Sequence, residues 1–253
     1  MTNIILSGAN GRMGRAISEK VQKSDTCRIV AGYDINDFCK NSYPVFTDIE
    51  KCDVEADVIV DFSHPSAFSA VLGFAKKRKL PLIVATTGLT KEQKDELFCA
   101  KSEIPVFYSA NMSLGVNLLI NLCKNAASVL GDKFDIEIVE KHHNKKLDAP
   151  SGTALSIADA ISEVLENTPE YVYDRHSVRR ERLKNEIGIH AVRGGNIVGE
   201  HEVIFAGEDE VITLSHSAAS REVFAAGAIA AAEFMKGKPA GLYSMNELIG
   251  EML

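Results

Sequence analysis

The chain has 253 residues, of which 45% are hydrophobic and 25% charged, and its formal net charge is −7. A chain of this length can bury a core as one large domain or two modest ones, and the acidic balance argues against general nucleic-acid binding. No apolar run is long enough to cross a membrane, and the first residues lead straight into a predicted strand without a secretory signal. The five cysteines lack C-x-x-C spacing and fit reduced thiols, so we expect a cytoplasmic protein.

The N-terminal segment has the order strand, glycine turn, helix. Residues 3–7 are mostly apolar, and residues 8–14 read Gly-Ala-Asn-Gly-Arg-Met-Gly before an amphipathic helix. The spacing G-x-x-G-x-x-G is one residue off the usual dinucleotide-binding pattern, but Gly11 and Gly14 keep the roles of close pyrophosphate approach and helix–strand packing. We therefore predict a dinucleotide-binding domain. The alternative is a glycine-rich turn in another kind of α/β protein.

Asp34 ends the second predicted strand, residues 28–33. An acidic residue there binds the adenosine ribose hydroxyls of NADH and repels the 2′-phosphate of NADPH. Arg12, in the glycine turn, would offset part of that repulsion. We therefore expect NADH to be used, with NADPH as the alternative.

Further strand–helix units continue this domain. Predicted strands at residues 57–62, 82–85 and 106–108 alternate with helices, which is typical of a parallel, doubly wound sheet. Ligands of such sheets bind beyond the carboxyl ends of the strands. We expect the segments at these ends to lie near the ribose and nicotinamide, with ordinary loop chemistry as the alternative for each. They are residues 63–64, 85–88 and 109–112.

The pattern changes after about residue 131. Strands are predicted at residues 134–140, 187–193, 197–206 and 211–218. The last two form an antiparallel hairpin, and a helix ending near residue 166 lies between the first two. The predicted fold is therefore α/β: a Rossmann-type parallel-sheet domain plus a smaller α+β domain with a mainly antiparallel sheet. The helix over residues 224–236 and the short tail after it return to the first domain.

Residues 140–154 are the segment richest in chemistry. Two adjacent histidines, His142 and His143, precede a lysine pair that ends at Lys146, and a proline-fixed turn leads to Ser-Gly-Thr at residues 151–153. The unpaired N–H groups and the dipole of a helix start attract carboxylate or phosphate. The segment predicts a site for an anionic small molecule with proton donors beside it. The alternative is a charged surface loop that ends in an ordinary capped helix.

Other kinds of site find little support. His190, His201 and His216 lie in predicted strands, where structural roles are expected. Strand alternation sends the neighbours in Glu-His-Glu at residues 200–202 to opposite faces, and no Cys/His set has zinc spacing, so we predict no metal. The sequence also lacks the G-x-S-x-G elbow of hydrolases and the Walker loop of phosphoryl-transfer proteins.

Together these motifs resemble the 4-hydroxy-tetrahydrodipicolinate reductases, also called dihydrodipicolinate reductases, of lysine and diaminopimelate biosynthesis. The resemblance covers almost the whole chain, and the His-His…Lys…Asp-Ala-Pro-Ser-Gly-Thr-Ala string is its most specific part. It is carried by residues 8–14, 60–63, 85–88, 109–117, 140–154 and 241–245.

The resemblance implies a Rossmann domain made from both chain ends, residues 1–113 and 222–253. It also implies a central domain, residues 114–221, that binds a small cyclic dicarboxylate substrate and assembles the oligomer, usually a homotetramer. The implied reaction reduces 4-hydroxy-tetrahydrodipicolinate to tetrahydrodipicolinate with NADH or NADPH.

Roles for individual residues follow from the same resemblance. His142 is the implied general acid/base and Lys146 the implied proton donor. The substrate carboxylates would be bound by His143, Lys146, Gly152 and Thr153, with Ser151 at the same helix start. The cofactor would be held by Gly8, Ala9, Asn10, Gly11, Arg12, Met13, Asp34, Ala85, Thr86, Thr87, Ser109, Ala110, Asn111 and Met112.

Three positions depart from the family pattern. Ala85 replaces a common glycine, and Met112 stands where an aromatic residue is often found near the nicotinamide. Ile35 follows Asp34 where some members carry an arginine for NADPH, which favours NADH. Arg221 is a further candidate for a substrate carboxylate, against a plain salt bridge at a helix start.

Two other functions fit parts of the sequence. A two-domain dehydrogenase acting on another oxo- or amino-diacid would share every feature except the substrate. A nucleotide-binding redox sensor would need no proton donors in the central segment.

Overall fold

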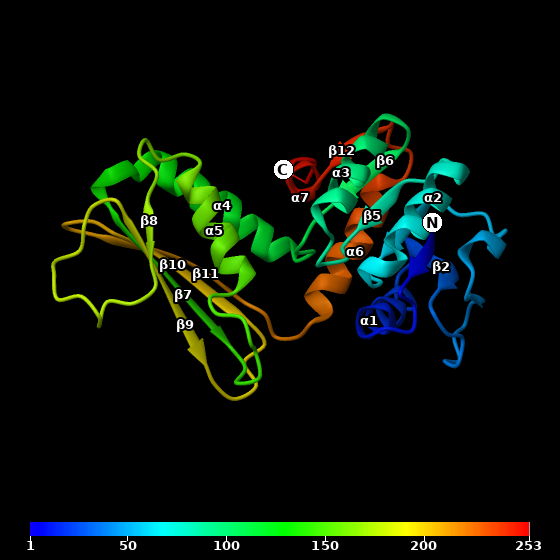
Figure 1. Ribbon diagram of the computed structural model, residues 1–253, viewed down its shortest axis with the longest axis horizontal. Coiled ribbons are helices and arrows are strands. Elements are labelled where there is room, and N and C mark those ends of the chain that lie inside the picture. Colours follow the sequence, from blue (N-terminus) through cyan, green and yellow to red (C-terminus); the bar gives the residue numbers. More distant parts are fainter. Residues whose placement is uncertain (253) are drawn as a thin grey trace. The chain divides into compact units, whose positions relative to one another are not determined.

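The computed structural model describes residues 1–252, apart from the side chain of residue 132. The chain divides into two compact units (Figure 1). The first unit holds Met1–Leu114 and the segment from Glu222 onward, and the second holds Gly115–Arg221. The first sheet is thus built from both ends of the chain.

The first unit contains a seven-stranded sheet in the order β12-β6-β5-β4-β1-β2-β3, and every pairing in it is parallel. The order runs in opposite directions from β1 and β4, which makes these two strands the switch point where doubly wound sheets bind ligands. The expected Rossmann-type sheet is confirmed. Its strands are β1 Thr2–Ser7, β2 Cys27–Tyr33, β3 Val45–Phe46, β4 Val58–Asp61, β5 Leu82–Val84, β6 Pro105–Tyr108 and β12 Gly241–Tyr243.

Helices cover both faces of this sheet, so the central strands are buried, with apolar residues along their middle and Ser7 and Asp61 at their carboxyl ends. One core lies with α1 and α6 and the other with α2 and α3. Helix α6 packs closely against the segment after β6 because its buried face is mostly alanine and glycine. A Cβ at Gly227 would lie 1.6 Å from the Met112 carbonyl oxygen. The helices are α1 Arg12–Val21, α2 Phe68–Arg78, α3 Lys91–Cys99, α6 Glu222–Met235 and α7 Met245–Gly250, with 3₁₀ turns η1 Ile49–Lys51, η2 Pro65–Ala67 and η3 Ala100–Ser102.

The second unit is a five-stranded sheet in the order β11-β10-β7-β9-β8, with helices packed against one face. Its core holds the inward residues of β7, β9 and β10 together with the apolar sides of α4 and α5. The elements are α4 Leu114–Leu130, η4 Gly131–Lys133, β7 Asp135–His142, α5 Gly152–Ser162, β8 Glu170–Val172, β9 Glu186–Arg193, β10 Glu200–Ala206 and β11 Val211–Ser217.

This second sheet is mixed and not mainly antiparallel as the sequence suggested. Strand β10 pairs antiparallel with both β7 and β11, but β9 pairs parallel with both β7 and β8. The difference arises because α5 carries the chain back along the sheet after β7, so that β8 and β9 run in the same direction as β7. The α+β character of the unit is as expected.

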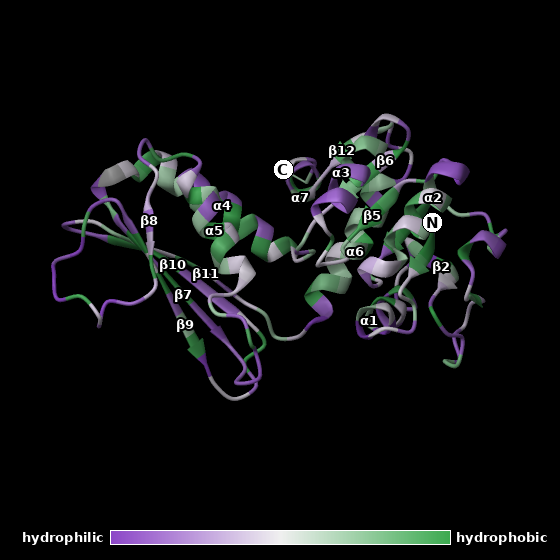
Figure 2. Ribbon diagram, in the orientation of Figure 1, coloured by the Kyte–Doolittle hydropathy of each residue, from purple (hydrophilic) through white to green (hydrophobic). Residues whose placement is uncertain are grey.

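The two sheets differ in exposure. Along β10, buried and half-buried residues alternate, as in a sheet that is covered on one face, whereas all four residues of β4 are buried. Figure 2 shows hydrophobic residues dominating β5, while much of the second unit's sheet is hydrophilic. Among residues 1–252, no helix combines the length and hydrophobicity that a membrane crossing needs.

Candidate active site

The glycine turn after β1 is shaped for close backbone contact. Gly8 has φ +78°, and a Cβ at Gly14 would lie 2.2 Å from the Gly8 carbonyl oxygen, so neither position tolerates a side chain. Gly11 begins α1 without a side-chain cap, and the first turn of α1 carries no acidic residue. The backbone N–H groups at this helix start therefore suit the pyrophosphate of a dinucleotide.

Asp34, which the sequence predicts to bind the adenosine ribose, lies beside this turn. Its Oδ2 accepts the backbone N–H of Asn10 at 2.9 Å, and the Asn10 amide donates to the Asn36 carbonyl at 2.6 Å. The turn and the segment after β2 are thus tied together by their own side chains. Of the other predicted residues of the turn, Ala9 is buried, Met13 is half-buried and Arg12 is exposed.

The ends of β4 and β5 are joined by a buried carboxylate, Asp61. The Thr86 hydroxyl donates to Asp61 Oδ2 at 2.8 Å, and the Ser63 N–H donates to Oδ1 at 3.2 Å. The Ala85 N–H donates to the Asp61 carbonyl at 3.0 Å. Asp61, a residue to which the sequence analysis assigned no role, therefore sets the conformation of the predicted segment 85–87, in which Thr87 is exposed.

The segment after β6 is held by its own polar groups. The Ser109 hydroxyl donates to the Asn111 carbonyl at 2.7 Å, and Asn111 Oδ1 accepts the Ser113 N–H at 2.9 Å, while Ala110 is exposed. The Met112 side chain is 2% exposed and packs in the core of the first unit. Met112 can therefore contact a cofactor only through its backbone atoms.

In the second unit, Glu140 and His142 lie on the same face of β7, two residues apart. His142 Nδ1 is 2.6 Å from Glu140 Oε2, and Arg193 at the end of β9 forms a two-pronged pair with Glu140 at 2.6 and 2.7 Å. Burial alone would raise the pKa of Glu140, but the hydrogen bonds from Arg193 and His142 and the Arg193 charge lower it. Glu140 is therefore a buried, ionised carboxylate.

His201 on β10 lies beside this pair. Its ring meets that of His142 edge-on, with centroids 5.2 Å apart, and its Nε2 is 2.9 Å from the Ser151 hydroxyl. Burial, aided by electrostatic interaction with His142, lowers the pKa of His201 to about 4. His201 is thus neutral at physiological pH.

Helix α5 begins next to these groups. Ser151 is its N-cap, with Oγ accepting the Ala154 N–H at 3.2 Å, and the Ser151 N–H donates to Glu140 Oε1 at 3.0 Å. Gly152 is exposed and Thr153 half-buried in the first turn, which contains no acidic residue. This helix start suits a carboxylate ligand.

Lys146 and His143 lie on the turn between β7 and α5. The Lys146 ammonium is 2.8 Å from Asp148 Oδ2, and its backbone N–H donates to the His143 carbonyl at 3.1 Å. The hydrogen bond from Lys146 lowers the pKa of Asp148. Because the Asp148 side chain is 60% exposed, this ion pair is weak and open to exchange with an anionic ligand.

The structure therefore joins His142 to the start of α5 through Glu140 and places His143 and Lys146 on the turn between β7 and α5. The glycine turn, Asp34 and the ends of β4, β5 and β6 lie in the first. Sequence reasoning missed Glu140 and Arg193, and it expected His201 to be structural. The pairing of β7 with β10 sets Glu140 opposite His201, and its pairing with β9 sets His142 opposite Arg193; no local pattern in the sequence reveals these registers.

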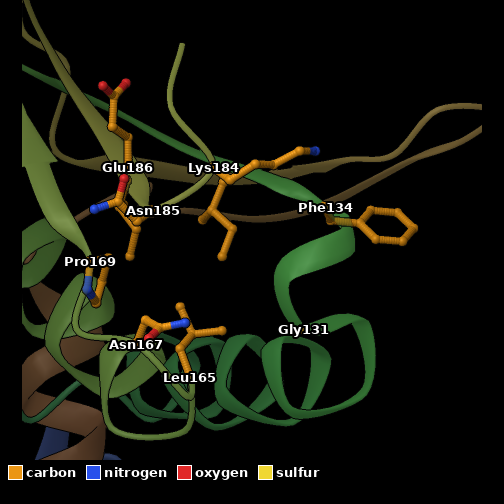
Figure 3. A pocket seen from close by; sticks show the side chains of 10 residues that line it. Gly131, Phe134, Leu165, Asn167, Pro169, Lys184, Asn185 and Glu186 are labelled. Atoms are coloured by element: carbon orange, nitrogen blue, oxygen red, sulfur yellow. The ribbon is translucent and has the colours of Figure 1, made fainter.

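A small cavity of about 90 Å³ lies at the other end of the second sheet, where β7 and β9 begin (Figure 3). Leu165, Asn167 and Pro169 line it on one side and Lys184 to Ile187 on the other. None of the predicted site residues contributes to it. Among the described side chains, no three His, Cys, Asp or Glu residues are grouped so as to hold a metal ion.

Comparison with known proteins gives concordant matches for both units. Residues 2–112 match the family described as dihydrodipicolinate reductase, N-terminus, and residues 115–249 match dihydrodipicolinate reductase, C-terminus. The chain is 54% identical to a 4-hydroxy-tetrahydrodipicolinate reductase of Caldanaerobacter subterraneus subsp. tengcongensis and 49% identical to one of Clostridium novyi. Each match spans 98% of both chains.

A solved structure agrees with these sequence matches. The dipicolinate-bound dihydrodipicolinate reductase from Paenisporosarcina sp. TG-14 superimposes with a TM-score of 0.81 at 25% identity, over 97% of this chain and 99% of that one. The similarity thus extends over both units.

Proposed function

This chain belongs to the dihydrodipicolinate reductase family, and on that premise we propose that it reduces 4-hydroxy-tetrahydrodipicolinate to tetrahydrodipicolinate in lysine and diaminopimelate biosynthesis. The observation that carries the proposal is the group of proton donors at the end of β7, beside a helix start that suits carboxylates. A reduced nicotinamide dinucleotide, when bound, supplies the hydride.

The second unit supplies binding and proton transfer. In its doubly protonated form His142 is the acid: Nδ1–H stays on Glu140 and the proton on Nε2 is the one given up. Lys146 binds a substrate carboxylate and donates a second hydrogen bond, exchanging its contact with Asp148 for the ligand. His143 and the Ser151, Gly152 and Thr153 start of α5 hold the other carboxylate.

The first unit holds the dinucleotide. The uncapped start of α1, with Gly8 to Met13, receives the pyrophosphate, and Asp34 receives the adenosine ribose. Segments 85–87 and 109–112 contact the nicotinamide half. Asp34 together with an uncharged Ile35 favours NADH over NADPH.

We also propose a cytoplasmic homotetramer assembled through the second unit. The face of its sheet opposite the helices carries exposed Val192 and Val211 beside half-buried Val139 and Ile204. Apolar side chains interspersed with charged ones on an open sheet face suit association with another copy. Native mass spectrometry is expected to give four times the chain mass, and a monomer would contradict the assembly.

One assay tests the function. The condensation product of pyruvate and aspartate semialdehyde is supplied with NADH or NADPH, and cofactor oxidation is followed. We expect turnover with this substrate and a higher kcat/KM for NADH. A dehydrogenase of another diacid would ignore the substrate, and a redox sensor would show no turnover with any diacid, so either result overturns the proposal.

A further inference from the structure

We propose that Glu140, held ionised by Arg193, is a positioning residue that fixes the proton of His142 on Nδ1 and so presents Nε2 to the substrate. The inference rests on the proposed function for its catalytic meaning, but its structural content concerns only the second unit. It adds Glu140 and Arg193 to the residues proposed above to bind the substrate and transfer the proton.

The hydrogen bonds of Glu140 establish where the proton lies. Each carboxylate oxygen receives two donors: Oε2 from His142 Nδ1 and Arg193 Nη1, and Oε1 from Arg193 Nη2 and the Ser151 N–H. An ionised carboxylate has about four acceptor positions and no proton to give. All four are filled, so the hydrogen between Glu140 and His142 belongs to the imidazole.

Burial makes this arrangement specific. The Glu140 side chain is fully buried, and the His142 side chain is 12% exposed. A buried carboxylate that lost a partner would be left with an unpaired charge, which is costly, so its four hydrogen bonds hold one another in place. Arg193 also donates to the Asp148 carbonyl at 2.7 Å, which ties the same network to the turn that carries Lys146.

The remaining neighbours leave Nε2 as the reacting atom. Gly199 lies beside it, and a Cβ there would come within 3.1 Å of Nε2, so the missing side chain keeps that edge of the ring clear. His201 contacts the ring from the side and is neutral, with its pKa lowered to about 4 by burial. Among the described side chains, Glu140 on β7 forms the ion pair with His142, and Arg193 on β9 pairs with the same carboxylate.

Glu140 also fixes how far His142 lies from the start of α5, where a substrate carboxylate is proposed to bind. Glu140 fixes His142 on one side and the Ser151 N–H, at the start of α5, on the other. Its loss should therefore reduce turnover more than cofactor binding, because His142 loses the partner that orients its ring and directs Nε2 towards the substrate, while the first unit is untouched.

The first test measures the tautomer directly, by ¹⁵N NMR of histidine-labelled protein, with the His142 signals assigned from the His142→Gln variant. Neutral His142 is expected to carry its proton on Nδ1 in the wild type. In Glu140→Gln the amide presents a donor, so the proton should move at least partly to Nε2. A wild type protonated on Nε2, or an unchanged tautomer in Glu140→Gln, would overturn the inference.

The second test is a kinetic cycle. Glu140→Gln should lower kcat by about 10²-fold, within the range of positioned acid catalysis, and leave the KM for NADH within about twofold. If Glu140 acts through His142, the same change in a His142→Gln background should cost less than about threefold. Losses that multiply in the double variant would show that Glu140 acts independently of His142 and would contradict the proposal.

Two further variants separate positioning from folding. Glu140→Asp keeps the charge and should recover part of the lost turnover and the Nδ1 tautomer. Glu200→Gln, the matched control, removes a carboxylate that pairs with Lys141 on the opposite face of the same sheet, and should change neither readout. Should the wild type fail to reduce the substrate, the proposed function falls, whereas the tautomer measurement still decides the role of Glu140.

Discussion

Lys145 and Lys146 are adjacent, but only Lys146 is placed to act on a ligand. Lys146 is 20% exposed and pairs with Asp148, while Lys145 is exposed. A charge-assisted hydrogen bond contributes about 1.5–3 kcal/mol, which is roughly 10- to 100-fold in affinity. We expect Lys146→Ala to raise the substrate KM by at least tenfold and to lower kcat, measured by steady-state kinetics. Lys145→Ala should stay within about twofold, and equal effects of the two variants would remove Lys146 from its role.

The choice of cofactor is also decided by single residues. Ile35 is 84% exposed and follows Asp34, which already holds the Asn10 N–H. An arginine at position 35 would meet a 2′-phosphate with a charge-assisted hydrogen bond, so Ile35→Arg should raise kcat/KM for NADPH relative to NADH by about tenfold or more. Ile35→Gln, of similar length but uncharged, serves as control. If Ile35→Arg leaves the ratio of kcat/KM values for NADPH and NADH unchanged, the 2′-position of the bound cofactor does not lie near residue 35.

The sequence predicts only those residues of the candidate site that stand close together in the chain. His142, His143 and Lys146 stand close together in the sequence, and their donors point to an anionic ligand without any knowledge of the fold. Arg193 lies 53 positions from Glu140, and their contact depends on the parallel pairing of β7 and β9. Such a register cannot be read from either strand alone, because it depends on how α5 and the segment after it cross the sheet.

At the scale of elements, long helices were the easiest to place. Helix α4 spans Leu114–Leu130 and follows the predicted strand at residues 106–108, and the return of the chain end to the first sheet is confirmed by β12, which pairs with β6. Strand β8 was missed because its three residues lie in a polar stretch and are held mainly by pairing with β9. Strand β7 continues to His142, so the proposed acid lies at the end of a strand and not on a loop.

Two glycines in helices of the first unit allow a matched test of packing in the glycine turn. A Cβ at Gly14 in α1 would lie 2.2 Å from backbone, whereas a Cβ at Gly73 in α2 meets nothing within 4 Å. Alanine favours a helix over glycine by about 0.5–1 kcal/mol, so Gly73→Ala should stabilise the protein by that amount. Gly14→Ala gains the same propensity but forces the turn apart, at a cost of about 1–3 kcal/mol or more.

Urea unfolding followed by far-UV circular dichroism measures both variants, since the chain contains no tryptophan. Gly14→Ala should also weaken NADH binding, because the turn that receives the pyrophosphate is displaced. If both variants gain stability, α1 does not pack on the turn as tightly as the structure indicates.

At the scale of the whole molecule, the buried histidines make stability depend on pH. Burial lowers the pKa of His201 to about 4 from its ordinary 6.5. Between these values the unfolded chain binds more protons than the folded one, so the stability is fully present above pH 6.5 and is lost as the pH falls towards 4. His216 on β11 has its pKa lowered by burial and acts in the same direction.

Buried carboxylates cause a second loss of folding stability, which occurs at lower pH. Burial would raise the pKa of both Glu137 and Glu140, but hydrogen bonds from their arginine and histidine partners lower it. Their stabilising contribution is present above the ordinary carboxyl pKa of 4.5 and is lost only below it, as the pH falls through their folded values. The interval between pH 5 and 7 therefore isolates the histidines.

For His201 alone, linkage predicts a loss of about 2 kcal/mol in the free energy of unfolding between pH 7 and pH 5. His201→Gln retains a partner for the Ser151 hydroxyl and removes the titrating ring, so its free energy of unfolding should depend less steeply on pH, whatever its absolute stability. His176→Gln, on an exposed loop, is the control and should keep the wild-type slope. Urea unfolding at fixed protein concentration measures all three, because assembly would otherwise contribute to the apparent stability. Equal slopes in the wild type and His201→Gln would mean that His201 is not the neutral, buried imidazole on which the geometry around His142 depends.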